Sequence, residues 1–425
     1  MKMQIKYFWT VAAAVFLLCA NAVEKQQDTL REKAQKGDPE AAFYLGSQYF
    51  YGEKRPKNLT LAAYWFKKAA DANIPEAQFN YACCLEAGQG VKKNLVESFS
   101  WYRKAAKSNF EPAMFRIAKF YLTGLRDPEK NTFLLAPSLR EVKEILEKLV
   151  EREYLPAELE YATFLVRKNN SEEHHAKAFQ LLKKITARKN PPPEAYRMLA
   201  DCYYAGFGCK QDLAKMAEFL TLAAEKGDHE AMAKLGFLYE YGHFFQKDLN
   251  RARKLYKQAA EAGHPMAQFK YAEDLSEGVY PGKNLNDALP WYQKSAAGNC
   301  PQAVFKLGVL HYEGLGIPKN LQRAAHYFFV AAKLGYPRAQ YNLAVMFADG
   351  KINQKMDKEA AFYWFLQAAE GNDLEAQKRV AKCYLDGIGV DRSITKAEEW
   401  LARAAKTGDP EAQRLLNQLR LIHFR

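Results

Sequence analysis

The chain has 425 residues, of which 48% are hydrophobic and 26% are charged, which is enough apolar material to bury a sizeable core. No run of 18 apolar residues occurs after the N-terminal segment, so no later segment is predicted to span a membrane. The formal net charge of +13 favours acidic partners, such as an acidic protein face, an acidic cell-wall polymer or lipid headgroups. A basic surface that serves only solubility is the alternative, because the lysines and arginines are spread along the chain.

Residues 1–22 are typical of a secretory signal peptide. Lys2 and Lys6 give a positively charged start, and Phe8 to Ala20 is an apolar stretch of 13 residues, which is short for a membrane span. Ala20-Asn21-Ala22 supplies the small residues that signal peptidase needs. Val23 is therefore predicted to begin the mature chain, and the loss of both lysines lowers its formal charge from +13 to +11.

Two other interpretations of this segment remain open. An uncleaved N-terminal anchor would carry the same charged and apolar parts. A lipoprotein would use Cys19, but lipidation favours a small residue before the cysteine, and Leu18 stands there. We predict export to the periplasm or the outside of the cell, and an exported chain is not expected to bind nucleic acid.

A short motif, Pro-Glu-Ala or a close variant, recurs along the rest of the chain. When its alanine is numbered position 0 of a repeat, the repeats start at 41, 77, 113, 157, 195, 231, 267, 303, 339, 376 and 412. Most steps are 36 residues and the longest is 44. Self-similarity at such a period is the signature of stacked repeats, which grow without the size limit of a single core. We predict ten repeats over residues 39–411.

Each repeat is predicted to hold two helices. The first begins near position 0, where Asp38-Pro39 caps the free N–H groups and fits the first turn. Apolar residues at positions 4, 5 and 8 form one face of a 3.6-residue period, and Tyr49, Tyr121 and Tyr239 at position 8 are expected to be buried. A glycine at position 11 ends this helix in most repeats, often with a second one two residues later, as in Gly88-Gln89-Gly90.

The second helix carries aromatic residues and a double alanine, as at Trp101-Tyr102 and Ala105-Ala106. The alanines let two helices approach closely, and the rings are expected to fill the space toward the next repeat. One repeat cannot bury its apolar face alone, so stacking is obligatory. Residues 23–38 and residues 412–425 are predicted to form capping helices at the two ends of the array.

The pattern A-x-x-x-L-G-x-x-Y-x-x-G-x-G-V, followed by A-x-x-W-Y-x-K-A-A-x-x-G, resembles the Sel-one-like (Sel1-like) repeat, a relative of the tetratricopeptide repeat. Ala77 to Val91 with Trp101 to Ala106 matches it well, as does Ala303 to Ile317. The resemblance covers residues 24–421. It implies an all-α protein, a right-handed α/α superhelical solenoid of about ten helix-turn-helix repeats of 36–44 residues. Proteins similar to this one are mostly adaptors, some of them exported bacterial proteins.

The resemblance also bears on the cysteines. The cysteine-rich exported members place one cysteine at position 0 and one in the second helix, and alanine at these positions implies that their disulfide ladder is missing here. Cys84, Cys202 and Cys383 share position 7 and are expected to be small buried hydrophobes. A disulfide between Cys202 and Cys209 is the alternative for that pair.

The middle of the array departs from the repeat pattern. Residues 125–138 lengthen the third repeat, and residues 167–194 lack the turn glycines and contain Pro191-Pro192-Pro193. Insertions that the surface tolerates explain both segments. A hinge or a partner-specific loop is the alternative.

The sequence contains no phosphate-binding loop, no G-x-S-x-G and no H-E-x-x-H motif. His174-His175 beside Glu172-Glu173 is the one cluster that suggests a metal site. Adjacent histidines diverge on a helix or loop, however, whereas metal ligands on a helix usually sit three or four residues apart. We therefore expect no enzymatic activity, no cofactor and no metal.

A second aromatic series lies at position 2 of the first helix. At 100° per residue this position is about 110° from the core face, toward the predicted concave side of the solenoid, and positions 6 and 9 neighbour it. Aromatic side chains are favoured interface anchors, so these positions supply the predicted partner-binding residues: Phe43, Phe50, Phe79, Phe115, Phe237, Phe269, Phe305, Tyr312 and Tyr341. The alternative is that position 2 packs between neighbouring first helices as part of the core.

The predicted function is that of a non-catalytic protein-protein interaction scaffold or adaptor in the bacterial envelope or outside the cell. Its partner, another protein, is expected on the concave face. The alternative is a protein that binds or modifies the cell wall through peptidoglycan or another glycan. An enzyme of that kind would need clustered ionisable groups in the irregular middle, and salt-sensitive retention on cell-wall material would indicate a glycan binder.

Overall fold

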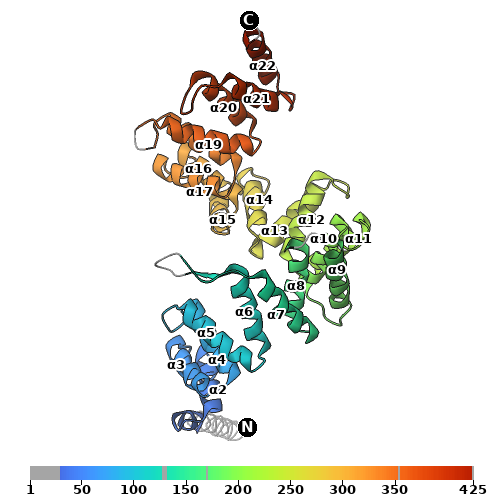
Figure 1. Cartoon of the computed structure of the whole chain (residues 1–425), viewed down its shortest axis with the longest axis vertical. Helices are drawn as coiled ribbons and strands as arrows, with labels where there is room; N and C mark the ends of the chain where they lie inside the picture. Colours follow the sequence, from blue (N-terminus) through green and yellow to red (C-terminus); the bar gives the residue numbers. More distant parts are fainter. Residues whose placement is uncertain (1–28, 127–131, 169–170, 353–354, 424–425) are drawn as a thin grey trace, which may run out of the picture. The chain divides into compact units, whose positions relative to one another are not determined.

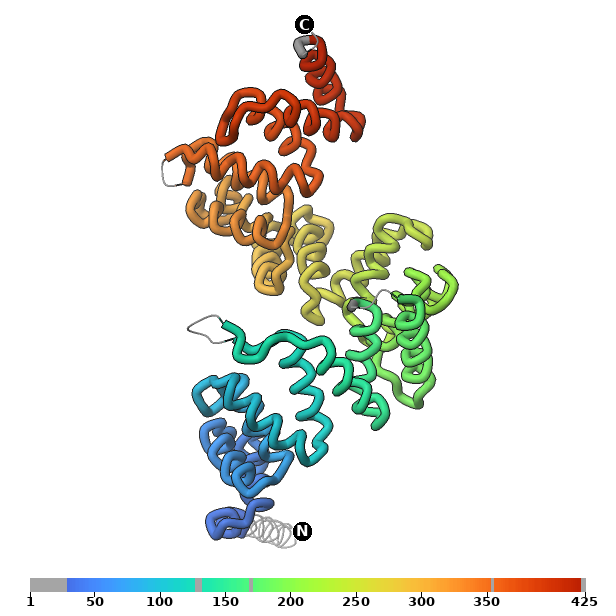
Figure 2. Tube along the Cα trace, viewed as in Figure 1, coloured from blue at the N-terminus to red at the C-terminus, as the bar shows by residue number. Residues whose placement is uncertain are grey.

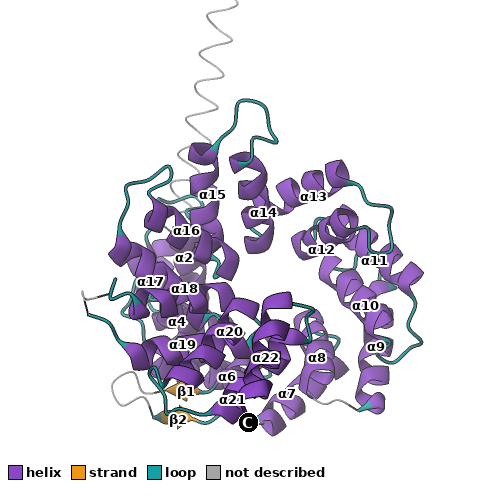
Figure 3. Cartoon of the chain, turned by 90° about the horizontal axis from the view of Figure 1, so that it is seen from above, coloured by secondary structure: helices purple, strands orange, loops and turns teal. Residues whose placement is uncertain are grey.

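The computed structural model describes residues 29–126, 132–168, 171–352 and 355–423. The predicted signal peptide, residues 1–22, lies outside these ranges. The described residues form helices that follow one another in pairs, together with one short β-hairpin (Figure 1, Figure 3). In this part of the chain, no helix has both the length and the apolar character that a membrane span requires.

Each repeat consists of a first and a second helix, and the Cα trace shows helix following helix along the chain (Figure 2). A first helix opens each repeat: α2 (Pro39–Tyr51), α4 (Pro75–Ala87), α6 (Glu111–Thr123), α8 (Leu155–Lys168), α10 (Pro193–Ala205), α12 (His229–Tyr241), α14 (Pro265–Ser276), α16 (Pro301–Glu313), α18 (Pro337–Ala348), α20 (Leu374–Asp386) and α22 (Pro410–His423). A second helix closes it: α3 (Leu59–Asp71), α5 (Leu95–Lys107), α7 (Leu139–Glu151), α9 (Glu172–Thr186), α11 (Leu213–Glu225), α13 (Leu249–Glu261), α15 (Leu285–Ala297), α17 (Leu321–Lys333), α19 (Lys358–Glu370) and α21 (Ile394–Ala405). A further helix over residues 29–35 precedes α2.

The first helices begin and end at the capping and terminating residues that the sequence indicates. In α2, the Asp38 carboxylate accepts a 3.1 Å hydrogen bond from the backbone N–H of Ala41, and Pro39 occupies the first turn. The missing N–H of proline costs nothing there, because the first turn has no partner for it. Gly52 ends the helix in the left-handed conformation with a φ of 77°, which glycine adopts without a steric penalty.

The second glycine of the turn lets neighbouring repeats touch. Gly90 has a φ of 73°, and a Cβ there would lie 2.0 Å from the carbonyl oxygen of Leu59, at the start of the preceding second helix. Gly389 meets the carbonyl oxygen of Lys358 at the same distance. A side chain does not fit such a contact, so glycine at this point permits the close spacing of the repeats.

The double alanine of the second helix lets the next first helix approach closely, as the sequence indicates. Ala69 and Ala70 of α3 are fully buried, and the next first helix lies directly against them. Its Gln78 side chain donates a 3.3 Å hydrogen bond to the Ala70 carbonyl oxygen. Gln268, Gln340 and Gln377 make the same bond at repeat position 1, to Ala260, Ala332 and Ala369. Neighbouring repeats are thus joined by a polar bond as well as by packing.

The chain divides into two compact units, one of residues 1–189 with 206–210 and one of residues 190–205 with 211–425. In the first, the core runs from repeat to repeat because the Tyr102 ring reaches Phe120 of the next first helix, with centroids 6.1 Å apart. In the second, Phe362 reaches Tyr384 at 5.3 Å. Aromatic side chains of the second helices therefore contact the next repeat, as the sequence predicts.

The lengthened third repeat contains a short β-hairpin, which the prediction of an all-α protein does not include. Strands β1 (Leu125–Arg126) and β2 (Phe133–Leu135) pair antiparallel, with Leu125 opposite Leu135. The reason lies at Gly124, which follows α6 with a φ of 75° and a ψ of 168°. The glycines that end α2, α4, α12, α16 and α20 adopt the left-handed helical conformation. The ψ of Gly124 instead directs the chain into an extended strand.

Two expectations about buried residues can be compared with the structure. Tyr239 is buried, with 7% of its surface exposed, but Tyr49 and Tyr121 at the same repeat position are only half-buried. Cys84, Cys202 and Cys383 are buried, in line with a role as small hydrophobes, and the described cysteines form no disulfide bond.

Candidate partner-binding surface

Five of the six rings at position 2 pack against a ring of the second helix of their own repeat. The ring centroids of Phe79 and Tyr102 lie 5.5 Å apart, and those of Phe305 and Phe328 lie 5.6 Å apart. The same contact, at 5.5 to 6.0 Å, joins Phe43 to Phe66, Phe269 to Tyr292 and Tyr341 to Phe365. The position-2 rings are half-buried, so each of them stabilises its repeat and remains partly accessible.

Position 2 also contacts the residue that precedes the next first helix, its N-cap. Phe79 lies 5.6 Å from Phe110, the N-cap of α6, and Phe305 lies 5.2 Å from Tyr336, the N-cap of α18. Aromatic pairs at such distances add about 0.5–1.5 kcal/mol beyond their buried area. The position-2 side chain therefore helps to fix the next repeat in place.

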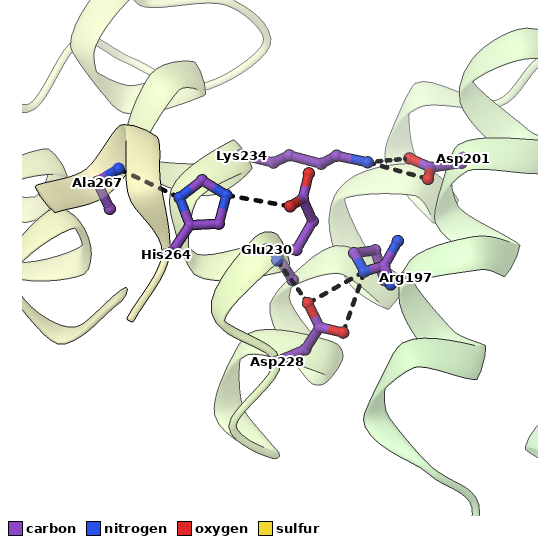
Figure 4. Close-up of polar contacts among 8 residues, drawn as sticks. Arg197, Asp201, Asp228, Glu230, Lys234, His264 and Ala267 are labelled. Atoms are coloured by element: carbon purple, nitrogen blue, oxygen red, sulfur yellow. Dashed lines mark hydrogen bonds and ion pairs between the residues drawn. The ribbon is translucent and has the colours of Figure 1, made fainter. Parts of the chain in front are cut away.

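Where position 2 is basic, the next N-cap is acidic. Arg197 lies 3.0 Å from the Asp228 carboxylate, which also accepts a 2.7 Å hydrogen bond from the backbone N–H of Ala231 at the start of α12 (Figure 4). Lys378 and Asp409 form the corresponding pair between α20 and α22 at 3.8 Å. In these repeats position 2 and the N-cap that follows it are thus matched in chemistry.

His264 caps α14 in place of an acid. Its Nδ1 accepts a 3.1 Å hydrogen bond from the backbone N–H of Ala267, so the proton of the neutral ring lies on Nε2, 3.0 Å from the Glu230 carboxylate (Figure 4). The hydrogen bond from His264 lowers the pKa of Glu230 from 4.5 to about 2. Lys234 pairs with Asp201 at 2.8 Å beside this contact.

Buried tyrosines of the second helices connect to the charges of the first helices. The Tyr256 hydroxyl donates a 2.6 Å hydrogen bond to Glu240, which also forms a 2.7 Å ion pair with Lys270 of the next repeat. Tyr102, Glu86 and Arg116 form the same triad, and so do Tyr292, Glu273 and Lys306. Burial raises the pKa of all three tyrosines above the usual range. These carboxylates and cations of the first helices are therefore already paired.

One group of aromatic side chains lies at the surface of α12 and the turn that follows it. Phe237 and Tyr241 are 48% and 52% exposed, and their ring centroids lie 4.6 Å apart. The exposed His243 ring stacks on Tyr241 at 6.0 Å and 17°, and Lys270 Nζ lies 5.8 Å from the Tyr241 centroid. We call Phe237, Tyr241 and His243 the Phe237 cluster.

The cluster includes one of the nine predicted partner-binding residues, Phe237. The other eight are half-buried: Phe43, Phe50, Phe79, Phe115, Phe269, Phe305, Tyr312 and Tyr341. Sequence reasoning missed Tyr241, although position 10 lies one helical turn beyond position 6 on the same face. Tyr51 shares position 10 and is 67% exposed, so the signal was present in two repeats.

The turn beside the Phe237 cluster is strained. Phe244 stands where Gly90 and Gly389 provide the second turn glycine, and it keeps the left-handed conformation with a φ of 68°. That conformation costs roughly 1–2 kcal/mol for a residue with a side chain. Phe244 is 50% exposed, and its neighbour Phe245 borders a 430 Å³ surface pocket against α11.

The histidine pair at the start of α9 diverges. The His175 ring is buried against Phe207, with centroids 4.2 Å apart, whereas the backbone N–H of His174 bonds the Ser171 hydroxyl at 3.3 Å. Among the residues that the structure describes, no group of three or more His, Cys, Asp or Glu side chains is placed to hold a metal ion.

Paired helices, turn glycines and matched contacts between repeats define an all-α repeat solenoid. The Sel1 repeat model matches it at residues 39–74, 75–110, 111–133, 193–228, 229–264, 265–300, 301–336, 337–373 and 374–409. The chain belongs to the Sel1 repeat family, whose members generally act as protein-interaction scaffolds and are typically non-catalytic. The unmatched residues 134–192 contain the end of the lengthened third repeat and the fourth repeat.

Comparison with a solved structure supports this fold. A protective antigen of uropathogenic Escherichia coli that displays an SLR fold is 27% identical, with 94% of this chain and 83% of that chain covered and a TM-score of 0.54. A Sel1 repeat protein from Oxalobacter formigenes is 22% identical, with 94% and 92% covered and a TM-score of 0.48. The comparison with curated proteins found no match.

Proposed function

We propose that this protein is a non-catalytic scaffold that binds partner proteins through the exposed face of its first helices, the predicted concave face. The Phe237 cluster carries the proposal, because it places two half-exposed rings and a histidine side by side at the surface. Aromatic side chains are enriched among the residues that supply most of the energy of an interface. The half-buried rings at position 2 remain partly accessible on the first helices and belong to the proposed surface.

A photo-crosslinking amino acid at position 241 tests this surface. In cells of the native host, crosslinks to a partner protein are expected at 241 and are expected to disappear when Phe237→Ser is added. Tyr363 is the matched control, because it is a tyrosine of the second helix α19 with a similar exposed fraction of 51%. Identical crosslinks at positions 241 and 363, or none at 241, would show that the surface is not an interface.

We further propose that the scaffold is exported, because residues 1–22 have the charged start, apolar stretch and small residues of a signal peptide. Mass spectrometry of the protein purified from its native host is expected to find Val23 as the first residue. A chain that still begins at Met1 would contradict export with cleavage.

A second candidate function, binding of an acidic cell-wall polymer, is favoured by one recurring feature. A basic side chain is exposed directly before the N-cap of the second helix in six repeats: Lys57, Lys93, Lys247, Lys283, Lys319 and Arg392. Such a row would attract a polyanion through charge alone, so salt should release it. Retention of the protein on isolated cell-wall material that salt does not reverse would argue against this candidate.

A further inference from the structure

A surface pocket lies between the second helix α11 and the turn that follows α12. Its volume is 430 Å³, within the range of about 300–1,000 Å³ that is usual for ligand sites. Ala217 and Leu222 of α11 and Phe245 of the turn form its apolar lining. Leu222 and Phe245 are half-buried, so both side chains remain accessible to a ligand. All three residues belong to the second compact unit.

The wall that Phe245 provides is held in place by its own contacts. The Phe245 ring stacks on Tyr239, with centroids 4.6 Å apart and planes at 19°, and Tyr239 is itself buried. The backbone N–H of Phe245 donates a 2.8 Å hydrogen bond to the His243 carbonyl oxygen. The opposite wall is a regular helix. The pocket is therefore preformed, as most ligand sites are.

The charged side chains that line the pocket are both carboxylates, Glu218 and Glu225. They are seven residues apart on α11, which places them on one face of the helix and about 10.5 Å apart along its axis. Leu222 lies between them on that face. Both carboxylates are exposed, and within the part of the chain that the structure describes neither forms an ion pair.

The surroundings of these carboxylates add no positive charge to the pocket. The last turn of α11 contains no basic residue, and the C-terminal end of a helix is the negative end of its dipole. Lys226 follows Glu225, but its Nζ lies 5.8 Å from the Tyr196 centroid. The Arg251 guanidinium lies 4.5 Å from the Tyr239 centroid. Neither cation lines the pocket, which therefore offers a ligand apolar surface and negative charge.

We propose that this pocket binds a basic segment of a partner protein. An apolar side chain of the segment lies on Leu222 and Phe245, and the arginine or lysine side chains that flank it pair with Glu218 and Glu225. The inference rests on the proposed scaffold function, but it places the recognition of basic segments on a second helix, at a surface separate from the Phe237 cluster.

The eighth repeat suggests a variant that fills the pocket. Phe329 stands nine residues after the N-cap of α17, as Thr221 stands nine residues after the N-cap of α11, and Phe329 is accommodated there with 43% of its surface exposed. The Thr221 hydroxyl donates its hydrogen bond to the Ala217 carbonyl oxygen within the same helix, so Thr221→Phe removes no hydrogen bond between repeats. The variant should fold, and binding of a basic segment should weaken about tenfold or more.

The probe is a short labelled peptide, blocked at both ends, in which one leucine stands between two arginines. Fluorescence anisotropy with the full mature chain is expected to show binding that salt weakens. Glu218→Gln with Glu225→Gln should weaken it about tenfold or more. Glu261→Gln with Glu370→Gln is the matched control, because it removes two exposed carboxylates from the last residues of α13 and α19. The control should bind the peptide as the unchanged protein does.

Two altered peptides test the two parts of the proposed contact. Aspartates in place of the arginines, or serine in place of the leucine, should weaken binding about tenfold or abolish it. Equal binding of the serine peptide would mean that charge alone is recognised, and it would overturn the proposal. The proposal would also be overturned if the peptide did not bind, or if both pairs of glutamine substitutions weakened binding equally.

Phe237→Ser separates the two proposals, and it should leave binding of the peptide unchanged. Loss of binding with Phe237→Ser but not with Thr221→Phe would overturn the pocket and leave the scaffold function standing. Because the chain is itself basic, a second copy is the other occupant to test. Sedimentation that shows self-association, abolished by Glu218→Gln with Glu225→Gln, would assign the pocket to that copy and also overturn the proposal.

Discussion

At the scale of single residues, the side chain at position 2 and the next N-cap act as a matched pair in several repeats. Asp228 does two things at once, because it caps α12 through Ala231 and neutralises Arg197. Asp373 caps α20 through Ala376 at 2.9 Å, but no cation pairs with it among the described residues. The two aspartates therefore differ only in the bridge to the preceding repeat.

Asp228→Ala is expected to cost more stability than Asp373→Ala. Loss of a cap costs about 1 kcal/mol in either helix, and loss of the hydrogen bonds to the mostly buried Arg197 adds about 1–2 kcal/mol. Hydrogen exchange of the amides of α12 and α20 measures each local change in the free energy of opening. Equal changes in the two helices would mean that the bridge contributes nothing.

His264 provides a prediction about pH. Because the pKa of Glu230 is about 2 in the folded protein and 4.5 ordinarily, its contribution to stability is complete above about pH 4.5 and is lost as the pH falls toward 2. His264→Asn keeps a capping side chain but removes the imidazole, so the pKa of Glu230 should rise toward 4.5. Titration of the Glu230 carboxyl by NMR checks this, and an unchanged value would show that His264 is not the cause.

At the scale of the elements, the turn between the two helices of a repeat controls how closely repeats approach. Gly90 places a backbone where a Cβ would meet the Leu59 carbonyl oxygen at 2.0 Å. In the sixth repeat Phe244 keeps the left-handed conformation without the glycine. The structure thus contains both the usual turn and a strained version of it.

Phe244→Gly is expected to raise the free energy of unfolding by roughly 1–2 kcal/mol, because it removes the left-handed strain. Gly90→Ala should lower it by more than that amount, since the strain and the clash with Leu59 add. Gly88→Ala is the matched control, because it has a similar φ of 72° but its nearest neighbour, the Lys93 Cβ, would lie at 3.3 Å. Urea unfolding measures all three variants, and a Phe244→Gly protein of unchanged stability would show that the turn is relaxed.

The elements also show how far the sequence predicts the structure. The repeat starts, both helices and the terminating glycines follow from local signals such as Asp38-Pro39 and Gly52, which act within one turn. The hairpin after α6 does not, because it depends on the ψ of Gly124, and a glycine in the sequence does not reveal which of its allowed conformations it adopts. The direction of the right-handed superhelix stays a prediction.

The candidate partner-binding surface can be predicted from the sequence only in part. A helical wheel places Phe79 off the core face, but it does not show that Tyr102 of the facing helix meets it there. Phe237 is a predicted partner-binding residue because it shares a face with position 2, and the exposure of Tyr241 beside it is evident only in the structure.

At the scale of the whole molecule, the division into two compact units predicts that they unfold separately. Leu45 and Leu343 stand at position 4 of the first and ninth repeats and are 0% and 1% exposed. Each leucine-to-alanine change should cost about 2–5 kcal/mol. Because repeats contact only their neighbours, Leu45→Ala should affect the first unit and Leu343→Ala the second.

Calorimetry combined with hydrogen exchange can separate the two effects. Leu45→Ala is expected to lower one thermal transition and to leave the exchange rates of α18 unchanged, and Leu343→Ala is expected to do the reverse. A single transition that both variants lower equally would mean that the chain unfolds as one cooperative body.

The pairing of position 2 with the following N-cap has a consequence for how such an array can gain or lose length. The segments 75–110, 193–228, 301–336 and 374–409 each contain both members of one pair. Duplication or deletion of a whole segment splits no pair. Arg197 stays with Asp228, and Phe305 stays with Tyr336, wherever their segments remain. Recombination in the turn between the two helices instead joins the first helix of one repeat to the second helix of another, which can leave a charge facing a ring. Inheritance by whole segments is therefore the route that preserves the fold.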